Sequence, residues 1–155
     1  MASSFSFSPE VRLLMESAGW YEGRNASGTF ATPGDVQYPP EIQLILNEFG
    51  GLFIPSSGRG ITLSRLSIEF DPSWADRESS EDGILWDYAT RTGITLYPLG
   101  HVPDESLTLC MDLQGNVYMA GDYLYLVGKS FEEGVSNILL GIEGKQLNEQ
   151  TLLWE

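Results

Sequence analysis

The sequence has little of what most catalytic and metal-binding sites are built from. It contains one cysteine, Cys110, and one histidine, His101, among 155 residues. One cysteine excludes an internal disulfide, and a zinc site would need carboxylates for nearly all of its ligands. The alternating acids around a central glycine that form a calcium loop do not occur. We therefore expect neither a metal nor another cofactor.

Basic residues and long apolar runs are also scarce. Eight Lys and Arg residues oppose 22 Asp and Glu residues, which gives a net charge of −14. Binding of nucleic acid or of an anionic membrane requires a positive surface, so neither is expected. No apolar run approaches the roughly 20 residues that cross a bilayer, and no secretory signal begins the chain, so we expect a cytoplasmic protein. The negative charge either attracts a basic partner or only keeps the protein soluble.

What the chain does have is enough apolar material for one ordinary core. Hydrophobic residues make up 42% of it and aromatic residues 12%. A chain of this length and composition is typical of one compact domain, here residues 1–155. Residues 1–4 carry nothing that would anchor them.

Caps and apolar spacing predict four helices. Ser8-Pro9, Pro39-Pro40 and Ser130 are typical helix starts, and Ser130 with Glu133 fits a capping box. Apolar residues then recur at helical spacing, and in the third helix Leu85 and Tyr88 point inward. The predicted helices run over residues 9–18, 40–49, 79–93 and 131–140.

Alternating and short apolar runs predict a sheet. The predicted strands cover residues 52–54, 61–70, 94–99, 107–111, 117–119 and 123–127. The alternation changes phase within 61–70, which indicates a bulge or two short strands. Gly100 is predicted to end its strand, so His101 is expected in a loop. Short connections between the later strands favour antiparallel pairing and an α+β fold with helices flanking a mostly antiparallel sheet.

Few residues fit a reaction centre. Cys110 and His101, with Asp104 as orienting acid, form a conceivable dyad, but a cysteine in mid-strand is typical of an inert small hydrophobe. Gly128-Lys129-Ser130 resembles the end of a phosphate-binding loop, yet Tyr123 stands where that motif needs a glycine. A small carboxylate-dependent hydrolase stays open as an alternative, because sequence spacing does not show which acids share a cleft.

One acidic segment exceeds the background. Residues 69–87 contain seven acids and one base, Arg77, a net charge of −6 in 19 residues, together with Trp74 and Trp86. Acids around exposed aromatics suit a surface that binds a basic partner, although a solvated face with both tryptophans in the core is an equally ordinary interpretation. The candidate partner-binding residues are Glu69, Asp71, Trp74, Asp76, Glu78, Glu81, Asp82 and Asp87.

Several stretches, in order, resemble the SUKH superfamily, specifically its third group of immunity proteins. The most specific combination is AGWYEGR, then EFGGL, then YPLG. The resemblance covers residues 7–141 as a core and leaves 142–155 as a tail, with residues 56–80 matching least. The stretches are residues 7–14, 18–24, 46–52, 96–100, 112–118, 126–131 and 139–141.

The resemblance implies an α+β fold and a role. Many SUKH proteins are encoded beside secreted bacterial toxins, often nucleases, and protect the producing cell by binding the toxin. It implies no catalytic residue, and Trp20 could anchor the core or line a partner-binding groove. The recurrent residues matched here look structural: Trp20, Gly50, Gly51, Tyr97, Pro98, Gly100 and Gly115.

We therefore expect a non-enzymatic immunity protein that binds a toxin with a basic surface. The alternative within the same superfamily is a general regulatory or scaffold module that binds other proteins inside the cell. Its gene would lack a toxin neighbour.

Overall fold

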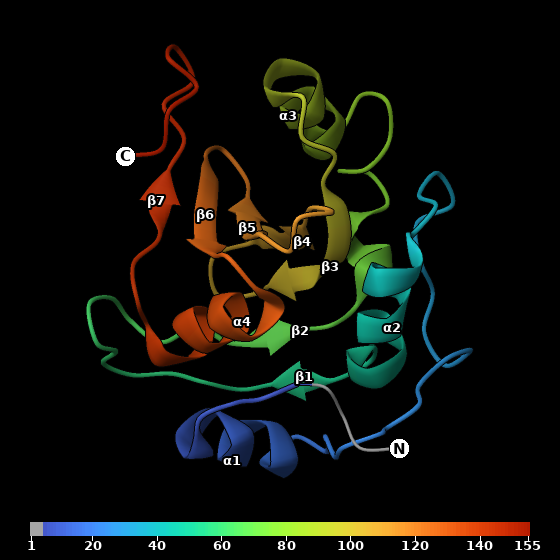
Figure 1. Cartoon of the computed structure of the whole chain (residues 1–155), viewed down its shortest axis with the longest axis vertical. Helices are drawn as coiled ribbons and strands as arrows, with labels where there is room; N and C mark the ends of the chain where they lie inside the picture. The colour runs from blue at the N-terminus through green and yellow to red at the C-terminus, as the bar shows by residue number, and fades with distance from the viewer. Residues whose placement is uncertain (1–4) are drawn as a thin grey trace.

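A computed structural model describes residues 5–155 (Figure 1). Residues 1–4, for which the sequence predicts no anchor, lie outside this range. The described part contains the helices α1 (Pro9–Ser17), α2 (Pro40–Phe49), α3 (Ile84–Thr92) and α4 (Phe131–Leu140), with a short 3-10 helix, η1 (Pro72–Ala75). Its strands are β1 (Phe53–Ile54), β2 (Ile68–Glu69), β3 (Tyr97–Val102), β4 (Leu107–Met111), β5 (Val117–Ala120), β6 (Leu124–Gly128) and β7 (Lys145–Gln146).

The strands form one sheet in which spatial order equals chain order, from β1 to β7. Every neighbouring pair is antiparallel. The two edge strands, β1 and β7, have two residues each. The predicted α+β fold with a mostly antiparallel sheet and flanking helices is confirmed.

Helix starts follow the predicted caps. Ser8 accepts a hydrogen bond from the backbone N–H of Val11 (3.4 Å), and Ser130 accepts one from that of Glu133 (3.1 Å). The Glu133 carboxylate turns back to the N–H of Lys129 (3.4 Å), one residue before the position that a strict capping box would use. Ser130 is thus a helix cap.

The sheet divides the apolar residues into two cores because successive side chains of a strand point to opposite faces. On one side, residues such as Leu109 and Val117 pack with α1, α2 and α4. On the other, Cys110 and Tyr118 pack with Leu85 and other residues of α3 and the C-terminal segment. In Figure 1, α4 lies in the lower part of the view in front of the sheet, and α3 lies at the top, beyond the upper ends of the strands.

The strand predicted over residues 61–70 is wrong for most of its length. Only Ile68–Glu69 forms a strand, and residues 61–66 form a loop against the end of α4. The N–H groups of Ile61, Thr62 and Leu63 donate to the carbonyls of Leu140 and Gly141, and the N–H of Leu66 donates to that of Ile138. The loop therefore satisfies the carbonyls that a helix leaves unpaired at its C-terminus.

Three further boundaries differ from the prediction, and one of them is the start of β3, which lies at Tyr97 and not at Ile94. The third helix begins at Ile84 instead of Ser79, because the chain turns at Gly83, where a Cβ would clash with the carbonyl oxygens of Arg77 and Glu78. The strand predicted to end at Gly100 continues to Val102, so His101 lies in a strand and not in a loop. Gly100 is needed inside that strand because a Cβ there would clash with the carbonyl oxygen of Glu69.

The C-terminal segment packs through fewer residues than its sequence suggests. Trp154 lies against Tyr118 with ring centroids 5.7 Å apart and bridges to Leu147, which is buried. Leu152 and Leu153 are exposed. One tryptophan and one leucine provide the apolar contacts of the segment, and β7 pairing with β6 and the ion pair between Glu149 and Arg91 also hold it.

Candidate protein-binding surface

The acidic segment, residues 69–87, does not form one uniform acidic face. Three of its acids serve the fold: Glu69 lies 3.5 Å from Nε2 of His101, Asp71 caps η1, and Asp87 pairs with Arg91 at 2.8 Å. One oxygen of Glu78 is buried and accepts no hydrogen bond from residues 5–155. The other predicted acids of the segment, Asp76, Glu81 and Asp82, are exposed.

The two tryptophans of this segment have different environments. Trp74 stacks on His101 with ring centroids 4.4 Å apart and an interplanar angle of 7°. Trp86 on α3 is 49% exposed. The interpretation that both belong to the core is therefore wrong. Trp86 is the more exposed of the two, since Trp74 is 37% exposed.

Trp20 is an internal anchor. It is 2% exposed, donates from Nε1 to the carboxylate of Glu48 (2.9 Å) and stacks on Phe49. Nη1 of Arg24 donates to the backbone carbonyls of Glu48 (2.7 Å) and Gly50 (3.0 Å). The AGWYEGR and EFGGL segments thus meet through buried hydrogen bonds, and Trp20 does not line a groove.

The other residues of the family-like pattern occupy tight backbone positions. Gly50 has no room for a Cβ beside the Phe30 ring, and Gly51 has a φ of +84°. The backbone carbonyl of Pro98 accepts a hydrogen bond from the Tyr38 hydroxyl, whose ring lies against Tyr97.

Gly115 shapes the β4–β5 turn, where it has a φ of +92°. Asp112 is buried at the same turn and accepts hydrogen bonds from the backbone N–H groups of Gln114 and Asn116 and from the Tyr118 hydroxyl. A left-handed glycine and a buried carboxylate together fix this hairpin.

The residues of the conceivable dyad have separate partners. Cys110 is fully buried, and burial raises the pKa of its thiol far above the ordinary value, which keeps it protonated and unreactive. His101 contacts Trp74 and Glu69, while the Asp104 carboxylate accepts the backbone N–H of Ser67 (2.8 Å). Asp104 therefore does not orient His101, and the dyad, which the sequence already made improbable, is not formed.

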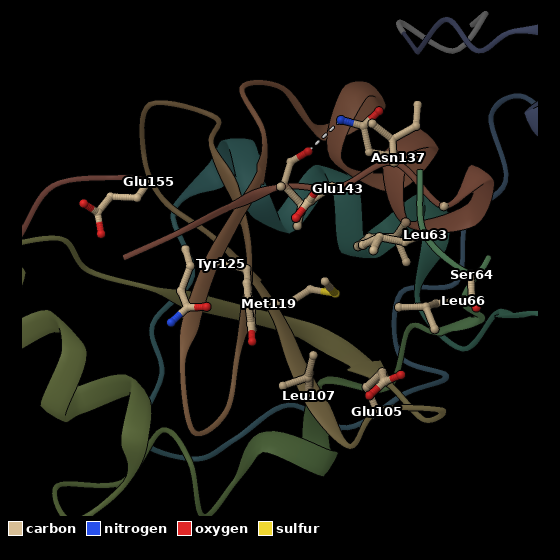
Figure 2. A pocket seen from close by; sticks show the side chains of 16 residues that line it. Leu63, Ser64, Leu66, Glu105, Leu107, Met119, Tyr125, Asn137, Glu143 and Glu155 are labelled. Carbon is tan, nitrogen blue, oxygen red and sulfur yellow. Dashed lines mark hydrogen bonds between the residues drawn. The ribbon is translucent and has the colours of Figure 1, made fainter. Parts of the chain in front are cut away.

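A groove opens between α4, the loop of residues 61–66 and the neighbouring face of β4, β5 and β6. Its cavity volume is about 480 Å³. Figure 2 shows Met119 near its centre, with Leu63 and Leu66 on one side and Leu107 on another. The lining consists of Leu63, Ser64, Leu66, Glu105, Leu107, Met119, Tyr125, Val127, Asn137, Ile138, Gly141, Ile142, Glu143, Gly144, Gln146 and Glu155.

The charged residues that line this groove are all acidic. Glu105 lies in the β3–β4 connection, Glu143 follows α4, and Glu155 lies in the C-terminal segment. Figure 2 places Glu105 and Glu143 on opposite sides of the opening and Glu155 away from both. The groove therefore combines an apolar floor with a negative rim from two parts of the chain, the β3–β4 connection and the segment that follows α4.

Sequence reasoning missed this groove. Its acids are isolated in the sequence, and Ile61 and Leu63 were assigned to a strand although both are exposed, at 69% and 49%. Their exposure is a property of the fold, so the sequence itself did not mark these neighbouring apolar residues as part of a surface.

Residues 5–155 contain neither a group of metal ligands nor a membrane-spanning helix. No three His, Cys, Asp or Glu residues of this range are grouped so that they could hold a metal ion. None of the helices in the same range has the length and apolar character that crossing a membrane requires.

An open apolar groove on a strongly acidic α+β body has the surface character of a protein-binding module. A family model described as SUKH-3 immunity protein matches residues 7–141. The chain belongs to the SUKH-3 immunity protein family, which indicates a toxin-neutralising role with a protein toxin as partner. Comparisons with curated proteins and with solved structures gave no significant match.

Proposed function

We propose that this protein is a non-enzymatic immunity protein that binds its cognate toxin inside the producing bacterium and neutralises it by covering the toxin's functional surface. The observation that carries the proposal is the groove, with its apolar floor and wholly acidic charged rim. Membership in an immunity protein family supports the same conclusion. Covering a surface is sufficient to inhibit, so no chemistry by this chain is required.

The proposed partner has a basic surface. With a net charge of −14, this protein is attracted to positively charged proteins and repelled by phosphate polymers. Nucleases need a positive cleft for their own substrates, so a nuclease-type toxin is the partner class that best complements this chain.

We assign the acidic segment a supporting part in this binding. Its exposed acids Asp76, Glu81 and Asp82 add to the negative potential, and Trp86 offers a large exposed apolar surface beside them. Exposed charges mainly accelerate encounter, whereas groups that lose their water on binding slow dissociation. The segment would therefore attract the toxin without being its principal contact.

Co-purification with the protein encoded beside its gene tests the proposal. The expected result is a stable complex, together with survival of cells that express that toxin when this protein is co-expressed. A charge-matched control is an unrelated acidic domain expressed at the same level, which should give no survival. Absence of both complex and rescue would reject the immunity role and favour the regulatory or scaffold alternative.

A further inference from the structure

We infer that the groove receives a short cationic segment of the partner, with an apolar side chain on the floor and basic groups against Glu105, Glu143 and Glu155. This inference rests on the proposed function and specifies where and how the toxin is held.

The floor of the groove consists of apolar side chains that the fold leaves incompletely covered. Leu66, Leu107, Met119 and Tyr125 are partly buried residues that pack against the larger core cluster. Their inner sides are fixed by that core, so their outer sides present a firm apolar surface. Covering such a surface removes apolar area from water, which is the main favourable contribution to association.

The size of the groove limits what enters it. A volume of about 480 Å³ lies within the range of about 300–1,000 Å³ that accommodates a small ligand. One or two side chains of a partner fit this space, whereas a whole helix with its side chains would be too wide, at about 10–12 Å across. A short segment that inserts one anchor residue is the matching shape.

The rim selects a positive partner. The groove is lined by three carboxylates and by no Lys or Arg. The backbone N–H of Glu143 donates to the Thr62 hydroxyl (2.7 Å), which ties its backbone to the loop, and the Glu155 carboxylate accepts from Asn148 (3.0 Å). Carboxylates around an apolar floor attract basic side chains and repel acidic ones.

Charge also argues against a second copy of this chain as the occupant. Each copy carries a net charge of −14 and only eight basic residues, so an acidic rim would repel it. A basic toxin has the opposite sign and fits the rim.

The walls of the groove are already formed without a partner. The loop of residues 61–66 is held to the end of α4 by backbone hydrogen bonds to Leu140, Gly141 and Ile138. At this junction Gly60 and Gly141 approach so closely that a Cβ on either would clash with the other. A preformed wall reduces the ordering cost of binding.

The floor and the rim differ in their relation to the family. Leu66, Leu107, Met119 and Tyr125 lie within the matched residues 7–141, whereas Glu143 and Glu155 follow them. The floor therefore lies within the matched residues, together with Glu105, while the other two acids of the rim lie beyond them. The rim, built partly from the C-terminal segment, determines which partner is accepted.

The first test measures dissociation of the neighbouring gene's product from two double variants. Leu63→Asp with Glu143→Lys alters the groove, and we expect the dissociation rate to rise by about 100-fold or more. The matched control, Leu44→Asp with Glu41→Lys, makes the same changes at exposed positions of α2 and should change the rate less than about 3-fold. Equal rates for both variants would overturn the inference while leaving the immunity role intact.

A second pair of substitutions, at exposed side chains only, distinguishes weaker binding from loss of folding. Glu105→Lys and Glu143→Lys change only exposed side chains, so circular dichroism and the unfolding midpoint should match those of the unaltered protein. The pair should still accelerate dissociation at least about 10-fold, and an unchanged rate would contradict the part assigned to the rim.

The second test needs no toxin. The probe is a capped hexapeptide with two leucines flanked on each side by two lysines, added at low ionic strength to the isotopically labelled protein. We expect amide chemical-shift changes centred on Leu66, Leu107 and Met119, and none with the peptide in which glutamate replaces lysine. No shifts at millimolar peptide, or self-association that Leu63→Asp abolishes, would overturn the inference. Shifts at the groove without binding of the neighbouring product would overturn only the proposed function.

Discussion

The groove and the acidic segment are both negatively charged, but they are built in opposite ways. The segment collects seven acids within 19 consecutive residues, and the fold then uses Glu69 for a contact with His101, Asp71 for a helix cap and Asp87 for an ion pair with Arg91. The groove collects three acids from positions 38 and 12 residues apart along the chain, Glu105, Glu143 and Glu155, around an apolar floor. Charge density along a sequence therefore does not measure charge density on a surface.

The difference has a physical basis. Acids that are close in sequence share one stretch of backbone, and the helix ends and turns of that stretch need hydrogen-bond acceptors. Their charges also repel one another unless some are paired, so several of them cap helices or form ion pairs within the fold. Acids that tertiary structure brings to one surface from separate parts of the chain are not needed as caps for the same stretch of backbone. The comparison predicts that the segment acts on the rate of encounter and the groove on the lifetime of the complex.

Outside the groove, the largest effect is expected from reversing the three exposed acids of the segment. Replacing Asp76, Glu81 and Asp82 by lysine should lower the association rate with the toxin by about 10- to 100-fold at low ionic strength, because electrostatic steering is lost. Stopped-flow mixing measures this rate. The effect should nearly disappear in 0.5 M salt, a concentration at which the Debye length is only about 4 Å. A large rise in the dissociation rate instead would make the segment a principal contact and break the comparison.

An intermediate effect is expected within the segment, on stability. Trp74→Ala removes the stacking on His101 and should lower the free energy of unfolding by about 1–2 kcal/mol. Trp86→Ala, at a side chain that is 49% exposed, should change it by less than about 0.5 kcal/mol. Urea unfolding of both variants gives the two values. Equal losses would mean that the contacts of Trp86 stabilise the fold as much as the stacking of Trp74 on His101.

The smallest effect concerns alkaline pH at α3. Burial, with a smaller contribution from nearby Glu149, raises the pKa of Tyr88 from 10.0 to about 12. The folded state therefore keeps the Tyr88 proton between pH 10 and 12, where the unfolded state loses it, so its contribution to stability is complete below pH 10 and declines above it.

Tyr88→Phe isolates this contribution. The variant loses the hydrogen bond to the carbonyl of Gly121 and should be slightly less stable at pH 8, but its stability should fall less steeply between pH 10 and 12. Unfolding midpoints measured across this range give the slope. Tyr123→Phe, at an exposed tyrosine, is the matched control and should leave the slope unchanged. Parallel slopes for Tyr88→Phe and the unaltered protein would contradict the assignment.

Much of the fold could be predicted because local chemistry determines it. Ser8 and Ser130 cap helices as their sequences indicate, and the β4–β5 hairpin follows from Gly115. In each case the residues that decide the structure lie within a few positions of one another, so periodicity and turn chemistry are sufficient.

The errors occurred where a distant residue decides the structure. The predicted strand at residues 61–66 is a loop because the end of α4, about 75 residues later, offers carbonyls to its N–H groups. Gly100 continues a strand and does not end one, because its missing side chain makes room for the neighbouring strand β2. The groove depends on the same long-range contacts, which no local pattern encodes.

The short edge strands of the sheet affect how readily the unbound protein aggregates. An exposed sheet edge is a template on which another chain can add a strand and begin an aggregate. Here β1 and β7 each offer only two residues for such pairing, and β7 carries the exposed Lys145. The short edges therefore limit aggregation by strand addition between copies of this protein, even while its apolar groove is not covered by a partner.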